Sequence, residues 1–555
     1  MGDNGRGACI LGWGGYIPLR RFDITELVRR REKDKIDYYR HGLWAEEKAI
    51  PGLDEDTITI GWEAARNAVR RAEIDGRKIE ASFFGRESGP YAVGSSGLQV
   101  AAFFESCEHL KHVADLELAC NSGMEAVNIC RSYVESGEIN CGLAVGADIS
   151  GGAEGDPLEI LVGCGSGSFV IGKNGSKRDV AALIVDVVGN AGLEQDFWRR
   201  EGQPNPAHFG ETTKRAYMHR VLTSTRKMLE KHGITLNHFR WITCHSPYAK
   251  LVEQTFRPVS VIQTFLHPNE ITEELRKEMK ENPEVVVKRA EEFSYLNKYY
   301  KKFVLNSLKI LTLSEAERKE KIHPTLLSRW VGNSYAGNTP LNLAHVLDMA
   351  EPGQDILAIS YGSWAASLAT WVRTLPGLDK KKGLAPSVKS LLERRKMLNW
   401  KDYYLIKIRR IREYLRMNRP PKRVIGEIQP LEGKKIKIQI CHGCKRVYFP
   451  AKDLCIDEKC PGFNDTAILE TKMYPSRAIL KSFKKRCRVK TYKIYAESKA
   501  IITDTYPPYL VEGVELEAIV RKIDEEGDEG QVRYGIVYRA VMGAPAASTN
   551  IKAGV

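Results

Sequence analysis

The stretch LELACNSGMEAVNICRSYVE, residues 116–135, joins a short apolar run to a helical pattern through one cysteine. Leu116–Cys120 predicts a buried strand, and the residues from about Ser122 to Glu135 predict a helix that follows at once. The sulfur of Cys120 would then lie at the positive end of the helix dipole, where a thiolate is favoured. Cys120 is therefore a candidate nucleophile, and the alternative is a buried, inert cysteine, as most free cysteines are.

The residues around this stretch, up to about position 375, alternate strand and helix patterns, which predicts an α/β fold. The two halves follow a similar plan and suggest an internal duplication. A glycine-rich turn is expected at Gly163–Gly167. Helices are expected at 57–72 and 214–232, and strands at 8–12, 81–84, 141–148, 168–172, 181–188, 240–245, 355–361 and 367–373.

Three further polar residues follow predicted strands. Glu87 lies in the loop GRES (85–88), His245 in CHSPYAK (244–250) and Asn333 in GNSYAGN (332–338). Taken singly, each has an ordinary structural interpretation: a solvated loop carboxylate, a satisfied core histidine and a simple turn. Because α/β folds assemble sites at strand ends, we expect all three to lie near Cys120.

Bulk composition limits the class of protein. A chain of 555 residues predicts two or three domains, and 43% hydrophobic with 28% charged residues is ordinary for a soluble globular protein. No apolar run approaches the roughly 20 residues needed to span a bilayer, and the first residues lack a signal-peptide layout. Twelve cysteines fit a reducing compartment if they are thiols and metal ligands, so a cytoplasmic location is expected.

The net charge of +14 is concentrated in one segment. Residues 380–423 hold 16 Lys and Arg and three acidic residues, an excess of 13, so the rest of the chain is close to neutral. This argues against a nucleic-acid-binding surface spread over the protein. The basic connector, 381–430, could face the phosphates of coenzyme A, pack on an acidic surface or be a solvated helix.

The C-terminal part contains a second motif. Cys441-x2-Cys444 and Cys455-x4-Cys460 are separated by ten residues, a zinc-ribbon layout of four thiolates around one tetrahedral ion. Loss of the metal and an iron site of rubredoxin type are the alternatives.

These signals predict four segments: a catalytic domain over 1–380 with a helical insertion at about 253–325, the connector 381–430, a zinc ribbon over 431–465 and an OB-like barrel over 466–555. Barrel strands are expected at 492–503, 514–523 and 531–541. The barrel has few basic residues interleaved with aromatics, which argues against nucleic acid.

The ordered motifs resemble those of one family. PGLDEDTITIGWEAARNA (51–68), the Glu87 loop, Cys120, DFWRREG (196–202) and the His245 and Asn333 motifs occur in the order found in 3-hydroxy-3-methylglutaryl-CoA synthases of the thiolase superfamily, closest to the archaeal branch. The resemblance covers about residues 6–252 and 330–375. The zinc ribbon and barrel resemble the DUF35 family, a separate subunit beside archaeal enzymes, which here is fused.

The resemblance implies a five-layered thiolase fold, a homodimer or larger assembly, and CoA thioesters as substrates. Because no apolar run is long enough to span a bilayer, no membrane partner is expected. Cys120 would accept the acyl group, and Glu87 would be the general acid and base. His245, Asn333 and the backbone of Gly362 or Ser363 would polarise thioester carbonyls, and Lys250 would bind substrate.

Departures from the family pattern leave the second substrate open. Residues 121–124 are Asn-Ser-Gly-Met where the family usually has Lys-Ala-Gly-Thr, Ser246 and Ala249 also differ, and the 253–325 insertion is additional. The leading prediction is condensation of an acyl-CoA with a ketoacyl-CoA, as in hydroxymethylglutaryl-CoA synthesis, which the retention of Glu87 favours. The altered residues around Cys120 and the insertion favour the first alternative, another C–C bond-forming acyl transfer from Cys120 to a non-CoA acceptor. A non-catalytic scaffold is the other alternative, and retention of the four site residues argues against it.

Overall fold

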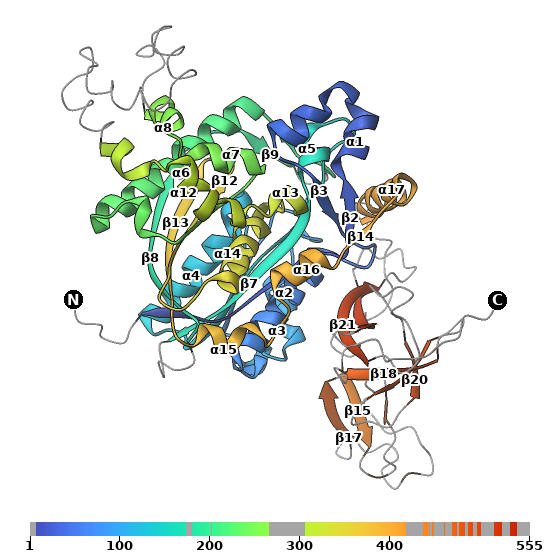
Figure 1. Ribbon diagram of the computed structural model, residues 1–555. Coiled ribbons are helices and arrows are strands. Elements are labelled where there is room, and N and C mark those ends of the chain that lie inside the picture. Colours follow the sequence, from blue (N-terminus) through green and yellow to red (C-terminus); the bar gives the residue numbers. More distant parts are fainter. Residues whose placement is uncertain are drawn as a thin grey trace, which may run out of the picture. The chain divides into compact units, whose positions relative to one another are not determined.

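The computed structural model describes residues 7–173, 180–200, 203–265 and 306–417, together with strands and single residues beyond 436. The chain forms two compact units: Met1–Gly52 with Asp56–Leu415, and Leu53–Glu55 with Arg416–Val555 (Figure 1). In these described stretches no helix combines the length and apolar composition needed to cross a bilayer.

A nine-stranded mixed sheet forms the centre of the first unit, which confirms the predicted α/β class. Its strand order is β11-β12-β13-β8-β1-β7-β6-β4-β5. The strands are β1 (Ala8–Tyr16), β4 (Ala81–Gly85), β5 (His112–Leu116), β6 (Cys141–Ile149), β7 (Cys164–Lys173), β8 (Ala182–Ala191), β11 (Trp241–Cys244), β12 (Asp355–Gly362) and β13 (Ala366–Thr374).

The sheet contains the same arrangement twice. In β4-β6-β7-β1 the successive pairs are parallel, antiparallel and antiparallel, and β11-β12-β13-β8 repeats this sequence of directions. The halves join through only two pairs, Cys9 with Leu183 and Ile10 with Ala182. The strands that precede Glu87 and His245, β4 and β11, therefore hold equivalent positions.

Four long helices pack on these strands: α2 (Thr57–Ala72), α4 (Ser122–Ser136), α6 (Gly210–His232) and α14 (Asn338–Met349). α2 contacts β1, β6 and β7, and α6 contacts β8, β12 and β13 in the same way. α4 and α14 contact each other, and α14 touches strands of both halves. α2 begins and ends where its pattern predicts, because Asp56 and Thr59 form a capping box at its start.

Two local predictions are wrong. The strand predicted at Leu116–Cys120 ends at Leu116, because the chain leaves the sheet edge and turns sharply, with φ of 44° at Ala119. The predicted turn Gly163–Gly167 lies largely within strand β7. Its glycines allow α14 to approach the sheet, since a Cβ on Gly167 would lie 2.2 Å from the carbonyl carbon of Pro340.

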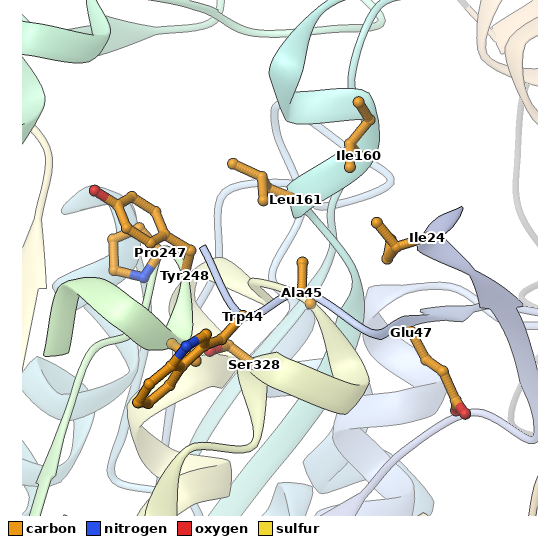
Figure 2. A pocket seen from close by; sticks show the side chains of 11 residues that line it. Ile24, Trp44, Ala45, Glu47, Ile160, Leu161, Pro247, Tyr248 and Ser328 are labelled. Carbon is orange, nitrogen blue, oxygen red and sulfur yellow. The ribbon is translucent and has the colours of Figure 1, made fainter. Parts of the chain in front are cut away.

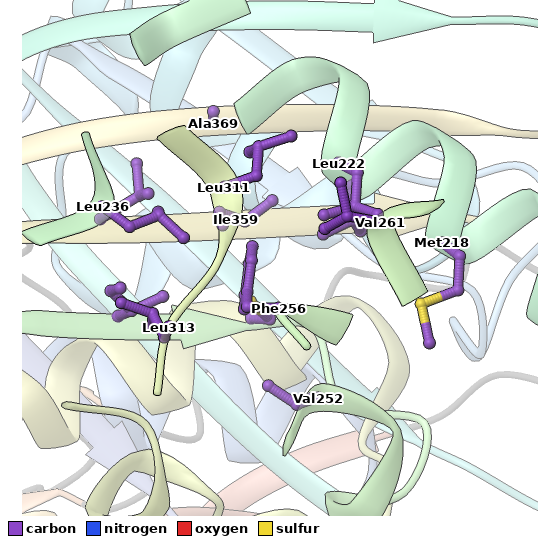
Figure 3. Close-up of a cluster of buried hydrophobic side chains, with 14 of the residues drawn as sticks. Met218, Leu222, Leu236, Val252, Phe256, Val261, Leu311, Leu313, Ile359 and Ala369 are labelled. Atoms are coloured by element: carbon purple, nitrogen blue, oxygen red, sulfur yellow. The ribbon is translucent and has the colours of Figure 1, made fainter. Parts of the chain in front are cut away.

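The described ends of the predicted insertion belong to the core of the second half. α7 (Ala249–Thr255), α8 (Pro258–Phe265) and α12 (Glu315–Lys321) are helical, as predicted, and residues 266–305 lie outside the described part. Phe256, Val261 and Leu313 are buried in one cluster with Ile359 of β12 (Figure 3). The insertion therefore begins and ends as part of the packed domain.

Helix α17 (Trp400–Met417) carries much of the basic connector and packs on the first unit beside β2 (Arg20–Asp23) and β14 (Lys396–Met397) (Figure 1). Tyr403 stacks on Phe22 with ring centroids 4.2 Å apart. Lys407 pairs with the buried Glu159 of α5 (Pro157–Leu161). The connector was expected to face CoA phosphates, to pack on an acidic surface or to be solvated. The ion pair between Lys407 and Glu159 agrees with the second of these interpretations for this face of α17.

Other elements of the first unit are short. They are α1 (Ile24–Arg31), β3 (Glu47–Ile50), α3 (Ser96–Phe103), β9 (Phe197–Trp198), β10 (Ala207–His208), α13 (Ser328–Val331), α15 (Leu378–Lys382) and α16 (Val388–Glu393).

The described strands of the second unit form two antiparallel sheets. One has the order β16-β15-β17 and the other β20-β19-β18-β21-β22. The predicted strands 514–523 and 531–541 correspond to β21 and β22, and β20 is the described part of the predicted strand 492–503. Their bounds are β15 (Lys437–Cys441), β16 (Val447–Tyr448), β17 (Leu469–Met473), β18 (Arg477–Ser482), β19 (Cys487–Thr491), β20 (Glu497–Ala500), β21 (Glu515–Ile523) and β22 (Arg533–Ala540).

Candidate active site

Cys120 and Glu87 lie beside each other inside the first unit, where each shifts the pKa of the other. Cys120 lies in a 3₁₀ turn, Ala119–Asn121, directly before α4, and its side chain is 5% exposed. Glu87 follows β4, and Gly85 brings this strand end against α4, since a Cβ there would lie 2.2 Å from the Ser122 carbonyl carbon. Oε1 of Glu87 is buried without a hydrogen-bond partner. One carboxylate oxygen is therefore available to a bound molecule.

The protonation of this pair differs from the expectation. Burial, reinforced by the charge of Glu87, raises the pKa of the Cys120 thiol well above its usual value. Burial, with the nearby charge of Asp148, raises the pKa of Glu87 to about 8. The resting cysteine is thus a thiol, and the predicted thiolate is wrong for this state, because burial beside a carboxylate outweighs the helix dipole.

Asp148 at the end of β6 holds the Glu87 loop. Its buried carboxylate accepts hydrogen bonds from the backbone N–H groups of Glu87 (2.9 Å), Ser88 (2.7 Å) and Ala336 (2.9 Å). One side chain thereby connects the Glu87 loop to the loop that carries Asn333. Asp148 was not among the predicted site residues, although an acidic residue at the end of a buried strand is a usable signal.

His245 follows β11, in the position that repeats that of Glu87. Its backbone N–H donates to Ile359 (2.7 Å) and its carbonyl accepts from the Tyr217 hydroxyl (2.7 Å). Burial lowers the pKa of the imidazole to about 3, so the ring is neutral near pH 7. Nδ1 is buried without a hydrogen-bond partner, which leaves it available to a ligand.

Asn333 lies on the loop that packs against Cys120. Its N–H donates to Leu161 (2.9 Å), and its carbonyl accepts from Gly163 (2.8 Å). Its side-chain oxygen accepts from the N–H of Tyr335 (3.0 Å), whose ring is buried in one cluster with Cys120 and Val162. Asn333 is therefore held close to the cysteine by both backbone and side chain.

Gly362 and Ser363, at the end of β12, reach the cysteine turn from the second half. A Cβ on Gly362 would lie 2.4 Å from the Leu118 carbonyl oxygen and 2.8 Å from the Asn121 nitrogen. The next two residues, Trp364 and Ala365, have φ of 68° and 69°. Strained backbone of this kind concentrates at functional sites.

The close approach of Gly362 gives a direct test of this contact. Gly362→Ala is expected to force the two turns apart, to destabilise the protein by about 1–3 kcal/mol and to slow acyl transfer. Thermal unfolding and adduct formation on Cys120 measure both effects. Gly383→Ala is the matched control, because no atom lies within 4 Å of a Cβ at that position. Equal behaviour of the two variants would contradict the contact.

Asp196 and Arg199 of the motif DFWRREG (196–202) also belong to the site, although no chemical role was predicted for the motif. The buried carboxylate of Asp196 accepts from the Tyr361 hydroxyl (3.1 Å) and the Trp364 N–H (2.9 Å). Arg199 donates to the Glu87 carbonyl oxygen (2.7 Å). The segment therefore holds both the Gly362–Ser363 turn and the Glu87 loop.

Lys250 lies near a crevice beside the Asn333 loop. Its Nζ is 4.1 Å from the ring centroid of Trp44 and 3.8 Å from the Glu253 carboxylate. Trp44, Tyr248 and Ser328 line the crevice together with Leu161, which accepts the hydrogen bond of Asn333 (Figure 2). The structure thus brings Cys120, Glu87, Asn333 and the Gly362 turn together, and it places Lys250 at the neighbouring crevice.

The predicted metal ligands lie in the second unit. Cys441 ends β15, and Cys460 is buried. Cys444 and Cys455 lie outside the described residues.

A duplicated α/β sheet with a buried cysteine–carboxyl pair at its strand ends defines a thiolase-like enzyme. Comparisons with known proteins agree. The family described as hydroxymethylglutaryl-coenzyme A synthase C terminal matches residues 211–430. Synthases named hydroxymethylglutaryl-CoA synthase from Methanocaldococcus jannaschii and Methanothermobacter thermautotrophicus are 35% and 34% identical over 397 residues, which is 71% of this chain and 97% of theirs.

Solved structures share the fold. MvaS in complex with 3-hydroxy-3-methylglutaryl coenzyme A gives a TM-score of 0.58 at 19% identity, covering 76% of this chain and 94% of its own. An HMG-CoA synthase complexed with CoA gives 0.54 at 18% identity, covering 76% and 95%. The chain belongs to the hydroxymethylglutaryl-CoA synthase family and is a CoA-thioester-dependent condensing acyltransferase.

Proposed function

We propose that this enzyme takes an acetyl group from acetyl-CoA onto Cys120 and joins it to the ketone of acetoacetyl-CoA, giving hydroxymethylglutaryl-CoA. The observation that carries the proposal is the placement of the buried Cys120 thiol beside the Glu87 carboxyl. It unites a nucleophile and a base of raised pKa in one pair, which both steps need.

In the first step the sulfur of Cys120 attacks the thioester carbonyl while its proton passes to Glu87. The carbonyl–sulfur bond of the donor breaks, and coenzyme A leaves as a thiol with that proton. The neutral His245 and the backbone N–H groups of Cys120 and Ser363 are the proposed partners of the carbonyl oxygen, because such donors stabilise a developing oxyanion.

In the second step the ionised Glu87 removes a proton from the methyl group of the acyl-enzyme. The resulting carbon nucleophile attacks the ketone of the second substrate, and the ketone oxygen becomes a hydroxyl by taking a proton back from Glu87. Asn333 and His245 are the proposed partners of these carbonyl oxygens. Water then cleaves the Cys120 thioester and leaves a carboxylic acid on the product.

Lys250 and the crevice beside Trp44 are the proposed contact for the CoA part of a substrate. A cation close to an aromatic ring can hold both the phosphate charge and the apolar arm of such a molecule. This role rests on the position of Lys250 beside the Asn333 loop.

Product analysis tests the proposal. The purified chain is mixed with acetyl-CoA and acetoacetyl-CoA, and the acid-quenched products are separated and weighed by mass spectrometry. Hydroxymethylglutaryl-CoA is the expected product. An acyl-enzyme that forms but never reacts with acetoacetyl-CoA would contradict this acceptor and favour a transfer to a non-CoA acceptor, whereas no acyl-enzyme at all would favour a scaffold.

We propose further that Cys441, Cys444, Cys455 and Cys460 hold one structural zinc ion, in a ribbon over 431–465 that the connector 381–430 joins to the catalytic domain. The β15–β16 pairing supports this, since Cys441 ends β15 and the chain returns at Val447 as an antiparallel partner. Four thiolates suit a structural zinc ion. The five-strand sheet beyond it is the basis for proposing a DUF35-like, OB-like barrel.

Elemental analysis checks the zinc proposal, with one zinc per chain as the expected result. Cys444→Ala should lose the metal and expose the C-terminal unit to protease, because metal binding and folding are coupled in small ribbons. Cys487→Ala, outside the ligand set, should keep both properties. Full protection of the metal-free Cys444→Ala variant would oppose the proposal.

We also propose a homodimer formed through β5. This strand is the end strand of the described sheet, and all five of its residues are partly exposed. Leu98 and Leu118 near it are 45% and 38% exposed, so the edge offers both hydrogen-bonding groups and apolar area. Light scattering is expected to give twice the chain mass of 62.5 kDa, and a monomer at micromolar concentration would oppose the proposal.

A further inference from the structure

We infer that Arg199 is a positioning residue that controls proton loss from the Cys120–Glu87 pair, through its hydrogen bond to the Glu87 carbonyl and through its positive charge. The inference deepens the proposed function, and its main test needs no CoA substrate. Arg199 belongs to the motif DFWRREG, to which the sequence analysis assigned no chemistry.

The segment before Arg199 fixes the position of its backbone. Asp196 is held by Tyr361 and Trp364, as described above, and the Trp364 indole N–H donates to the carbonyl of Phe197 (2.8 Å). The Phe197 ring packs edge-on against Tyr335, with centroids 5.5 Å apart. The chain entering Arg199 is therefore tied to the Gly362 turn and to the Asn333 loop.

From this fixed backbone the Arg199 side chain reaches the Glu87 loop. One guanidinium nitrogen donates to the Glu87 carbonyl (2.7 Å), while another donates to Gln203 (3.3 Å). Arg199 therefore binds the carbonyl oxygen of Glu87, and Asp148 binds the N–H of the same residue. Both backbone polar groups of Glu87 are held by side chains.

Arg199 is the cation among the groups with the largest effects on the pKa of Glu87; the others are Cys120, Asp148 and Asp196, all of which are acids. The carboxyl of Glu87 acts in turn on the acid Tyr335. The neighbouring cation Arg86 forms ion pairs with Asp115 and Glu117. Asp148 and Asp196 raise the pKa of Glu87, whereas Arg199 lowers it. Removing the guanidinium charge would therefore leave the pair among like charges and shift its proton loss to higher pH.

The rate of Cys120 alkylation by iodoacetamide, measured by peptide mass spectrometry from pH 5.5 up to the pH at which the rate levels off, tests this inference. Arg199→Gln keeps a donor for the Glu87 carbonyl but removes the charge. We expect its alkylation midpoint to rise by about one pH unit and its rate at pH 7 to fall about tenfold. Arg199→Lys, which keeps the charge, should retain most of the wild-type midpoint.

Arg200→Gln is the matched control, because Arg200 is the exposed neighbour and should leave the profile unchanged. Arg199→Met serves as a second neutral variant if Arg199→Gln does not fold. An unchanged midpoint in the neutral variants, an equal shift in Arg200→Gln, or a uniform loss of rate at every pH would overturn the inference. A uniform loss would show a structural role only.

The condensation rate of the same variants provides a second reading. If the proposed function holds, its pH profile should shift with that of alkylation. If the chain does not make hydroxymethylglutaryl-CoA, the alkylation profile still decides the role of Arg199. Failure of the inference and failure of the proposed function are therefore distinguishable.

Discussion

Replacing Cys120 by alanine is expected to reduce product formation by a factor on the order of 10⁴ to 10⁶. The sulfur forms the bond to the acyl group, so its loss removes the covalent route and leaves only binding and the oxyanion donors. Steady-state product formation, with mass spectrometry of the intact chain, measures the loss of both turnover and adduct.

The matched control for Cys120→Ala is Cys107→Ala. Cys107 is an exposed cysteine, and it lies in the same half of the domain. It should keep full turnover and an adduct of unchanged mass. Retention of the adduct in Cys120→Ala, or its loss in Cys107→Ala, would assign the nucleophile to another residue.

Replacing Glu87 by glutamine should reduce condensation by about 10² to 10⁴-fold, the usual worth of a placed general base. Acylation of Cys120 should also slow, because Glu87 takes the thiol proton in the proposed first step. It should slow less than condensation, because a thiol loses its proton more easily than an acyl methyl group and the oxyanion donors remain. Single-turnover acylation and steady-state product formation, measured side by side, separate the two steps.

The wild-type pH profile gives an independent check on Glu87. Burial raises its pKa to about 8, so the carboxylate that removes the methyl proton is scarce at low pH and abundant above that value. Condensation should therefore rise with pH, with a midpoint near 8, and level off roughly one pH unit higher, and Glu87→Gln should abolish this rise.

Arg86 gives Glu87→Gln a structural control. Arg86 is the residue before Glu87, and it forms ion pairs with Asp115 (3.0 Å) and Glu117 (2.8 Å). An ion pair with Arg86 therefore does not explain the position of Glu87. Arg86→Gln should lower stability more than it changes the ratio of acylation to condensation. Parallel loss of both steps in Glu87→Gln would point to a structural role, and loss of neither would contradict the proposed mechanism.

Elements with regular patterns could be predicted from the sequence. The residues of α2 follow helical spacing and begin at a capping box, so Thr57–Ala72 is correct at both ends. The strand predicted over Leu116–Cys120 was too long because the composition of this stretch is strand-like. In the structure the strand ends at Leu116, and the chain turns away from the sheet at Ala119. The glycines of β7 mislead for a similar reason, since they serve packing against α14 and not a turn.

The positions of the site residues could be predicted from the sequence better than their protonation states. Glu87 and His245 were recognisable because they follow strands, and the duplicated sheet explains why these two strand ends hold equivalent positions. Asn333 was expected at a strand end as well, but it follows the short helix α13. The protonation of Cys120 could not be predicted, since it depends on how deeply a residue distant in sequence, Glu87, is buried beside it. Asp148 could not be predicted as a site residue because its carboxylate binds backbone N–H groups that come together only in the folded chain.

The acyl-enzyme itself tests the central claim most directly. Wild-type chain is mixed with acetyl-CoA, quenched in acid within one turnover and digested, and the peptide that contains Cys120 is weighed. We predict that this peptide alone carries one acetyl group and loses it when acetoacetyl-CoA is added, as hydroxymethylglutaryl-CoA forms. An unmodified Cys120 peptide, or an acetyl group on a different cysteine, would contradict the account.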